Sequence, residues 1–227
     1  MYFLFYYAII ILIPLWAQMR VKNTFAKYSR VPSSTYRRGA EVAREVLNAN
    51  GLYNVGIEEA QGFLGDHYDP RTKTVRLSSE NYHGNSLAAA AVAAHECGHA
   101  IQDAQGYAFL RFRHALVPVA NISSNASWVL IMIGFLAHLS GMLLLGIIFM
   151  AAAVLFQIIT LPVELNASSR AMDQIVSLGL IRNNEERETR KVLNAAALTY
   201  VAAAAVAVLE LLRYILIFTG MNRNNDD

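Results

Sequence analysis

The sequence has little cysteine and little charge for its length. One cysteine, Cys97, occurs among 227 residues, so no intrachain disulfide can form and a secreted scaffold held by disulfides is excluded. Charged residues make up 16% of the chain, against about 25% in an ordinary soluble domain. Hydrophobic residues make up 55%, more than a core of this size can hide, which predicts contact with lipid. The net charge is only +2 and no nucleic-acid-binding motif is present, so nucleic acid is not an expected partner.

Three apolar stretches are candidates for membrane spans: residues 2–19, 115–163 and 195–219. Nothing basic precedes the first stretch and its end is a poor cleavage site, which favours a retained anchor over a secretory signal. The second stretch is too long for one crossing. Residues 138–141 near its middle can turn the chain, so a helical hairpin of two spans is expected.

Lysine and arginine are distributed unevenly, and this predicts a topology. Twelve of the 19 lie between Arg20 and Arg113, and five more lie between Arg170 and Lys191. Basic segments normally face the cytoplasm, and an even number of crossings must then separate these two. We therefore expect a multi-pass protein of the cell membrane, with four spans, both termini outside and both basic segments inside.

The residues between the first two apolar stretches predict a small α+β domain. Residues 37–50 read as an amphipathic helix that stops at Gly51. Residues 54–61 and 74–78 read as strands, and the turn-forming residues 67–73 between them favour a β-hairpin. A helix over 87–105 follows, with Asn85 or Ser86 as its N-cap.

The sequence His95-Glu96-Cys97-Gly98-His99 lies within that last helix and predicts a zinc site. Residues four apart share one face of a helix, so both imidazoles can bind one ion. In this HExxH pattern the zinc ion acidifies a water molecule and the glutamate removes its proton. Glu96 is thus the expected general base, and Cys97, turned away from the metal face, is expected only to pack. Gly98 lowers helix stability, which is better explained by a close approach at the site.

A catalytic zinc site usually takes a third protein ligand. Gln102 and Gln105 stand where a metzincin would have a glycine and a histidine, so that class is excluded. Glu164, directly after the second apolar stretch, is the preferred third ligand. Five alternatives stay open: Glu185, Glu186, Glu188, Glu210 and His114.

The amino-terminal anchor, the HExxH helix and residues 66–70, 75–78, 82–86, 116–119, 161–164 and 191–200 carry a resemblance that covers nearly the whole chain. In these segments the chain resembles the YugP-like family of bacterial membrane zinc metallopeptidases, and more distantly HtpX and the CAAX prenyl proteases. The resemblance implies zinc bound by His95, His99 and Glu164, with Glu96 as the base. The chain departs from the HtpX pattern at Ser168, where an aspartate would follow the glutamate by four residues. It also has Asn166 in place of an aspartate that is common in YugP-like proteins.

Together these features predict a mainly α-helical integral membrane bundle of about four spans, carrying a small cytoplasmic α+β zincin-like domain. The expected function is hydrolysis of peptide bonds in a membrane-associated polypeptide substrate and, by analogy with HtpX, a role in membrane protein quality control. The alternatives are a non-catalytic zinc-binding scaffold or adaptor, and a transporter. The expected division is an anchor (1–19), the zincin-like domain (20–114), the transmembrane hairpin (115–163), a cytoplasmic segment with the third ligand (164–194), a last span (195–219) and a tail (220–227).

Two further expectations concern the substrate. The strand over 74–78 is expected to bind an extended peptide by edge pairing. Four loop residues are candidates for an additional hydrogen-bond donor to the oxyanion that forms in the reaction: His67, Tyr68, Tyr82 and His83.

Overall fold

The computed structural model describes residues 2–61 and 65–223. It is mainly helical and contains a three-stranded sheet. The described residues fall into two compact units. The first comprises residues up to Pro14, Arg111–Pro162 and residues from Tyr200 onward, and the second comprises Leu15–Leu110 and Val163–Thr199.

Four helices are long and apolar enough to cross a membrane: α1 (Tyr2–Tyr28), α5 (Ala108–Leu136), α6 (Ser140–Ser177) and α7 (Glu186–Arg223). At most 22% of the residues in the apolar window of each span are buried within the protein. Such exposed apolar surface matches lipid contact. By length and composition, these four helices confirm the predicted number of about four candidate spans.

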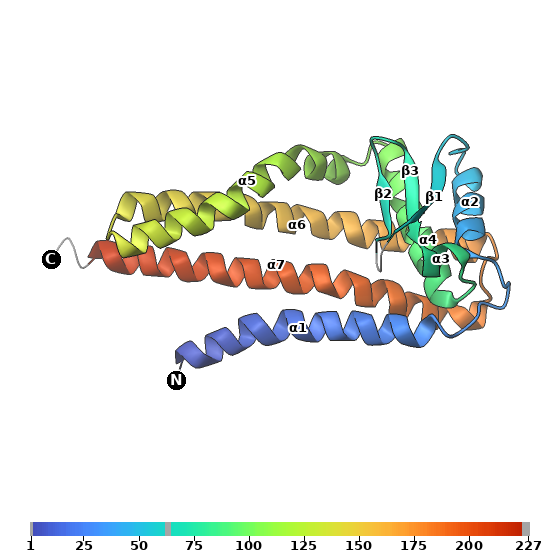
Figure 1. Ribbon diagram of the computed structural model, residues 1–227, viewed down its shortest axis with the longest axis horizontal. Coiled ribbons are helices and arrows are strands. Elements are labelled where there is room, and N and C mark those ends of the chain that lie inside the picture. Colours follow the sequence, from blue (N-terminus) through green and yellow to red (C-terminus); the bar gives the residue numbers. More distant parts are fainter. Residues whose placement is uncertain (1, 62–64, 224–227) are drawn as a thin grey trace. The chain divides into compact units, whose positions relative to one another are not determined.

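The first unit contains the predicted helical hairpin (Figure 1). α5 ends at Leu136 and α6 begins at Ser140, so the turn lies where the sequence predicted it. Two glycines allow the helices to pack closely: a Cβ on Gly134 would lie 2.6 Å from the Leu143 nitrogen, and one on Gly146 would lie 2.9 Å from the Ile131 nitrogen. Small residues serve this purpose at helix contacts in membranes.

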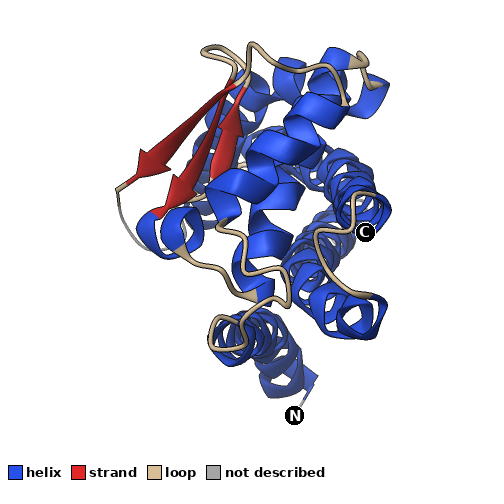
Figure 2. Cartoon of the chain, turned by 90° about the vertical axis from the view of Figure 1, so that its right-hand side faces the viewer, coloured by secondary structure: helices blue, strands red, loops and turns tan. Residues whose placement is uncertain are grey.

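The second unit contains the sheet and the short helices. These elements are α2 (Gly39–Ala49), β1 (Gly56–Ala60), β2 (His67–Asp69), β3 (Thr74–Ser78), α3 (Ser79–His83), α4 (Leu87–Ala104) and the 3₁₀ turn η1 (Asn183–Glu185). Figure 2 shows the three strands side by side, and α2 and α4 both contact the sheet and each other. Apolar side chains of α2, β3 and α4 form the core together with residues of α1, α6 and α7.

The helices of this unit follow the sequence closely. α2 buries Val42, Ala43, Val46 and Leu47 on one face and is followed by Gly51 in a left-handed conformation with φ of 71°. Ser86 caps α4 by accepting a hydrogen bond from the Ala89 backbone N–H. Both predicted helices are confirmed, and Ser86 is the N-cap.

The pairing of the strands differs from the prediction. The strand order is β1-β3-β2: β1 and β3 are parallel, while β2 and β3 form the antiparallel hairpin. The predicted hairpin between residues 54–61 and 74–78 is therefore wrong, because the residues read as a turn include β2. β3 is also central, with neighbours on both sides, so it lacks the free edge needed for the predicted pairing with a substrate.

Candidate metal centre

α4 presents His95 and His99 one turn apart on the same face. Their rings are nearly perpendicular, at 87°, with centroids 4.8 Å apart. The side chains are 14% and 10% exposed. As expected from their spacing of four residues on a helix, both imidazoles can therefore bind one ion.

Glu164 of α6 completes a convergent group. Its Oε2 atom lies 3.3 Å from Nε2 of His95 and 3.6 Å from Nε2 of His99, and its side chain is 3% exposed. One ligand atom from each of the three residues lies within 4.8 Å of the others. Tetrahedral ligands at about 2.0–2.1 Å from zinc stand about 3.3–3.4 Å apart. Two of the separations are already close to this value, so the donor set fits a zinc ion.

Three of the five alternative ligands, Glu185, Glu186 and Glu188, are not part of this group. Within residues 2–61 and 65–223, only the cluster of His95, His99 and Glu164 meets the requirement for a metal site. Three of the alternative glutamates are bound elsewhere: Glu185 accepts hydrogen bonds from Ser34, Glu186 pairs with Arg190, and Glu188 pairs with Lys191.

Gln102 determines which nitrogen of His99 faces the metal position. Its fully buried amide group donates to the Val163 carbonyl and to Oδ1 of Asn166, so its nitrogen is identified by two acceptors. Its oxygen therefore faces Nδ1 of His99 at 3.0 Å and accepts the Nδ1 proton. Nε2 of His99 is left with its lone pair toward the metal position, as ligation requires.

Ser168 has the matching position beside His95. Its hydroxyl oxygen lies 3.2 Å from Nδ1 of His95, while Nε2 of that ring faces Glu164. Ser168 follows Glu164 by one helical turn, so α6 provides both the carboxylate and the group that orients His95. The serine that departs from the HtpX pattern thus contacts the histidine directly.

Asn166 joins the same network. Its Oδ1 accepts hydrogen bonds from Gln102 and from Nε of Arg170, and Arg170 also donates to Gln105. Sequence reasoning assigned no role to Gln102, Asn166 or Ser168. Their spacing, three residues after His99 and two and four after Glu164, was visible, but its meaning depends on which helix faces which.

Gly98 allows α4 and α6 to approach each other. A Cβ at this position would lie 2.6 Å from the carbonyl oxygen of Ala167. Ala167 is next to Ser168 and less than a turn from Glu164, so this contact sets the depth at which α6 presents both side chains. The expected close approach at Gly98 is confirmed.

Glu96 is buried beside the convergent group. Burial raises the pKa of its carboxyl to about 7, the charges of Glu164 and Asp66 act in the same direction, and His95 and a hydrogen bond from the Tyr68 backbone N–H oppose them. A cation held by the neighbouring ligands would lower this pKa and favour the carboxylate. β2, through Tyr68, thus helps to hold the expected base.

Cys97 points away from the group. Its thiol is fully buried and lies 3.5 Å from the Ala43 carbonyl oxygen of α2. Burial and the charge of Glu96 raise the pKa of the thiol. The residue packs α4 against α2, as expected.

The suggested oxyanion donors are mostly engaged elsewhere. The Tyr68 hydroxyl donates to Asp103 at 2.8 Å, His83 lies 3.1 Å from Glu59, and Nδ1 of His67 lies 2.8 Å from the Gly65 carbonyl oxygen. Tyr82 stacks edge-on against His83. None of these four side-chain contacts involves His95, His99 or Glu164.

Comparison with known proteins agrees with this site. A family model described as "Putative neutral zinc metallopeptidase" matches residues 2–219. The chain belongs to this family. It is also 52% identical over 210 residues to the "Putative membrane protease YugP" of Bacillus subtilis (strain 168), covering 92% of this chain and 93% of that protein. No solved structure matches the chain. The resemblance to YugP-like proteins is thereby confirmed.

Proposed function

We propose that the protein is a multi-pass membrane zinc metalloendopeptidase in which His95, His99 and Glu164 bind zinc and Glu96 is the general base. The observation that carries this proposal is the convergence of two Nε2 atoms and one carboxylate oxygen from α4 and α6. Two histidines and one glutamate are a known ligand set of catalytic zinc, which leaves a position open. A structural zinc site would normally be closed by four protein ligands.

The reaction is hydrolysis of a peptide bond. Bound zinc supplies Lewis acidity, which polarises the scissile carbonyl and acidifies water. Glu96 accepts the proton of the attacking water and passes it to the leaving amine. Gln102 keeps His99 in the tautomer that leaves Nε2 free, and Ser168 orients the ring of His95 through Nδ1.

The substrate is proposed to be a polypeptide at the membrane surface, as expected of a protease in membrane protein quality control. Residues 141–163 of α6 carry no charged side chain, and Glu164 follows directly. At 1.5 Å per residue such a run spans about 35 Å, enough to cross the hydrocarbon core. The site therefore lies at the polar end of a membrane segment, on the cytoplasmic side by the distribution of basic residues.

The change Glu96→Gln tests the catalytic assignment. We expect peptide cleavage to fall by at least about 100-fold, because the base is removed, while zinc stays bound because its three ligands are intact. The full chain is purified in detergent, its zinc content is measured by mass spectrometry, and cleavage of an unfolded membrane protein is followed. Glu59→Gln, on the exposed part of β1, is the matched control and should keep both zinc and activity.

Two outcomes would contradict the proposal. Unchanged cleavage in the Glu96→Gln protein would exclude this residue as the base. Stoichiometric zinc without any cleavage by the native chain, across several unfolded substrates, would favour the non-catalytic scaffold.

A further inference from the structure

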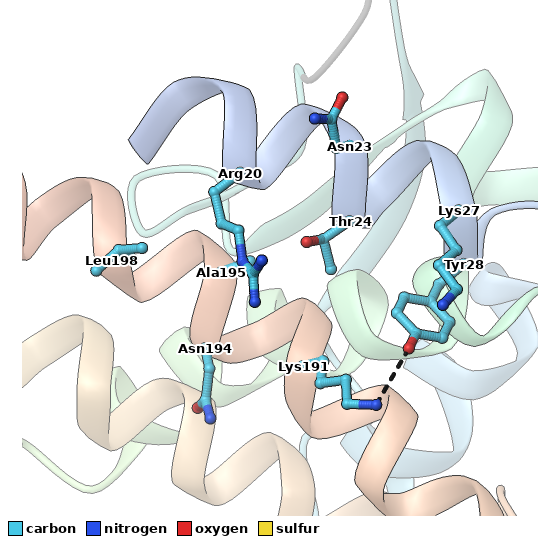
Figure 3. A pocket seen from close by; sticks show the side chains of 9 residues that line it. All are labelled: Arg20, Asn23, Thr24, Lys27, Tyr28, Lys191, Asn194, Ala195 and Leu198. Carbon is cyan, nitrogen blue, oxygen red and sulfur yellow. Dashed lines mark hydrogen bonds between the residues drawn. The ribbon is translucent and has the colours of Figure 1, made fainter. Parts of the chain in front are cut away.

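A cavity between α1 and α7 of the second unit shares no lining residue with the group of His95, His99 and Glu164. Its volume is about 650 Å³. Figure 3 shows the side chains around it, with Arg20 reaching from α1 toward α7. We call it the basic cavity; its nine lining residues are Arg20, Asn23, Thr24, Lys27, Tyr28, Lys191, Asn194, Ala195 and Leu198.

The charge of the basic cavity has one sign. Three of these nine described lining residues are cationic and none is acidic. Tyr28, whose ring is buried, accepts a hydrogen bond from Nζ of Lys191 at 3.5 Å and places its hydroxyl among the cations. Nζ of Lys191 also lies 3.5 Å from a carboxylate oxygen of Glu188, which is outside the lining. Arg20 and Lys27 keep the net charge of the lining positive.

The basic cavity lies where two helices change from apolar to polar. On α1, residues 2–19 carry no charge and Arg20 comes next. On α7, residues 195–209 carry no charge and Asn194 comes just before them. In a membrane these boundaries mark the level of the lipid headgroups.

Exposed apolar side chains lie on α1 within about one turn of Arg20. Leu15, Trp16 and Met19 are 47%, 54% and 50% exposed. Tryptophan is enriched at the boundary between headgroups and acyl chains. A ligand held here would thus meet cations at one end and apolar surface at the other.

We propose that the basic cavity binds the phosphate group of an anionic phospholipid. The three cations and the hydrogen-bond donors Asn23, Thr24 and Asn194 suit a phosphodiester, and the acyl chains lie along the exposed apolar residues of α1. Basic pockets between membrane helices bind anionic headgroups in this way. A soluble phosphate ester shares the phosphate chemistry but would leave Leu15, Trp16 and Met19 without a ligand.

The two tryptophans allow a direct test. Trp128→Phe leaves Trp16 as the sole tryptophan, one turn from Arg20. The full chain in detergent is titrated with brominated phosphatidylglycerol or brominated phosphatidylcholine, whose bromine atoms quench tryptophan fluorescence on contact. We expect phosphatidylglycerol to reach half-maximal quenching at a concentration about tenfold or more below that of phosphatidylcholine, because each nearby cation favours an anionic lipid.

Two triple variants with the same change in net charge distinguish binding in the basic cavity from general electrostatic attraction of the lipid. The variant Arg20→Gln/Lys27→Gln/Lys191→Gln should lose the preference. The variant Lys22→Gln/Arg30→Gln/Arg71→Gln removes the same charge from exposed residues outside the lining and should keep it. If the first variant elutes as aggregate, Arg20→Gln is compared with Lys22→Gln, and only the former should weaken binding.

Three results would overturn the proposal. The first is equal quenching by the two lipids. The second is an equal loss of the preference for phosphatidylglycerol in both triple charge variants. The third is relief of quenching by sn-glycerol 3-phosphate at the concentration at which phosphatidylglycerol binds, which would assign the cavity to a soluble phosphate ester.

Discussion

Gln102 makes three side-chain hydrogen bonds in the metal centre, and each has a known direction. It donates to the Val163 carbonyl and Asn166 and accepts from His99. Gln102→Leu keeps much of the volume but removes all three bonds. We expect zinc affinity to fall by about 10–100-fold, since loss of an orienting partner of a ligand histidine has this effect. The measurement is competition for zinc against a chelator of known affinity.

Gln105→Leu is the control for that change. Gln105 lies three residues further along the chain and contacts Arg170 rather than a histidine. Its replacement should leave zinc affinity within about twofold of the native value, because no orienting partner of a ligand histidine is lost. Equal affinity in both variants would show that Gln102 does not position His99.

Ser168 gives a second prediction at the scale of one residue. Ser168→Ala removes the oxygen beside Nδ1 of His95, and we expect zinc affinity to fall by about tenfold. Ser168→Asp should restore or exceed native affinity, because a carboxylate can only accept from the Nδ1–H group, which leaves Nε2 free for the metal. Ser169→Ala, at the exposed neighbouring position, should change nothing. If alanine at position 168 is as good as serine, the contact has no role in binding.

The residues of the centre differ in how well the sequence revealed them. His95, Glu96 and His99 lie within five residues, and helical spacing alone predicts that the two histidines share a face. Glu164 was preferred for its place at the end of an apolar run, and the structure brings it to the histidines. Gln102 and Ser168 act across the contact between α4 and α6, and their roles follow only when the rotation of both helices is known.

Gly98 links the chemistry of the site to the packing of two elements. In Gly98→Ala the new methyl group would meet the Ala167 carbonyl oxygen, which belongs to the backbone and cannot rotate away. α4 and α6 must separate, and Glu164 moves from the histidines. We expect a loss of stability of about 1–3 kcal/mol from overpacking, together with weaker zinc binding, measured by thermal unfolding with and without zinc.

Gly141→Ala is the matched control in the first turn of α6. A Cβ there meets nothing within 4 Å. Alanine is favoured over glycine in a helix by up to about 1 kcal/mol, so stability should stay equal or rise. A Gly98→Ala protein that unfolds and binds zinc like the native chain would show that the two helices tolerate the methyl group.

At the scale of elements, helices were easier to predict than strand pairing. The apolar faces of α2 and α4 and the cap at Ser86 are local, so the sequence reveals them. The order β1-β3-β2 is not local, because β1 does not pair with β2, the next strand in the sequence. It pairs in parallel with β3. β2 is three residues long and begins at His67, within a segment rich in turn-forming residues, so its period of two could not be recognised.

The whole molecule combines four apolar helices with two basic segments. The geometry of the metal centre and the distribution of basic residues predict the same topology. The metal centre needs His95, before the hairpin of α5 and α6, and Glu164, after it, on the same side. The distribution of lysine and arginine independently predicts the same arrangement. The division of the chain into domains at residues 19, 114, 163, 194 and 219 stays a prediction of this topology.

Labelling of single cysteines tests which side carries the metal centre. Cys97→Ala gives a chain without cysteine, and Tyr53→Cys or Leu139→Cys then adds one at a position that is 74% or 50% exposed. In the proposed topology the hairpin turn faces outward, so a membrane-impermeant maleimide should label Leu139→Cys in right-side-out vesicles. It should label Tyr53→Cys only in inverted vesicles, since the proposed topology places the basic residues 20–114 in the cytoplasm. The reverse pattern would place the metal centre outside the cell, and labelling of both positions from one side would exclude an α5 that spans the membrane.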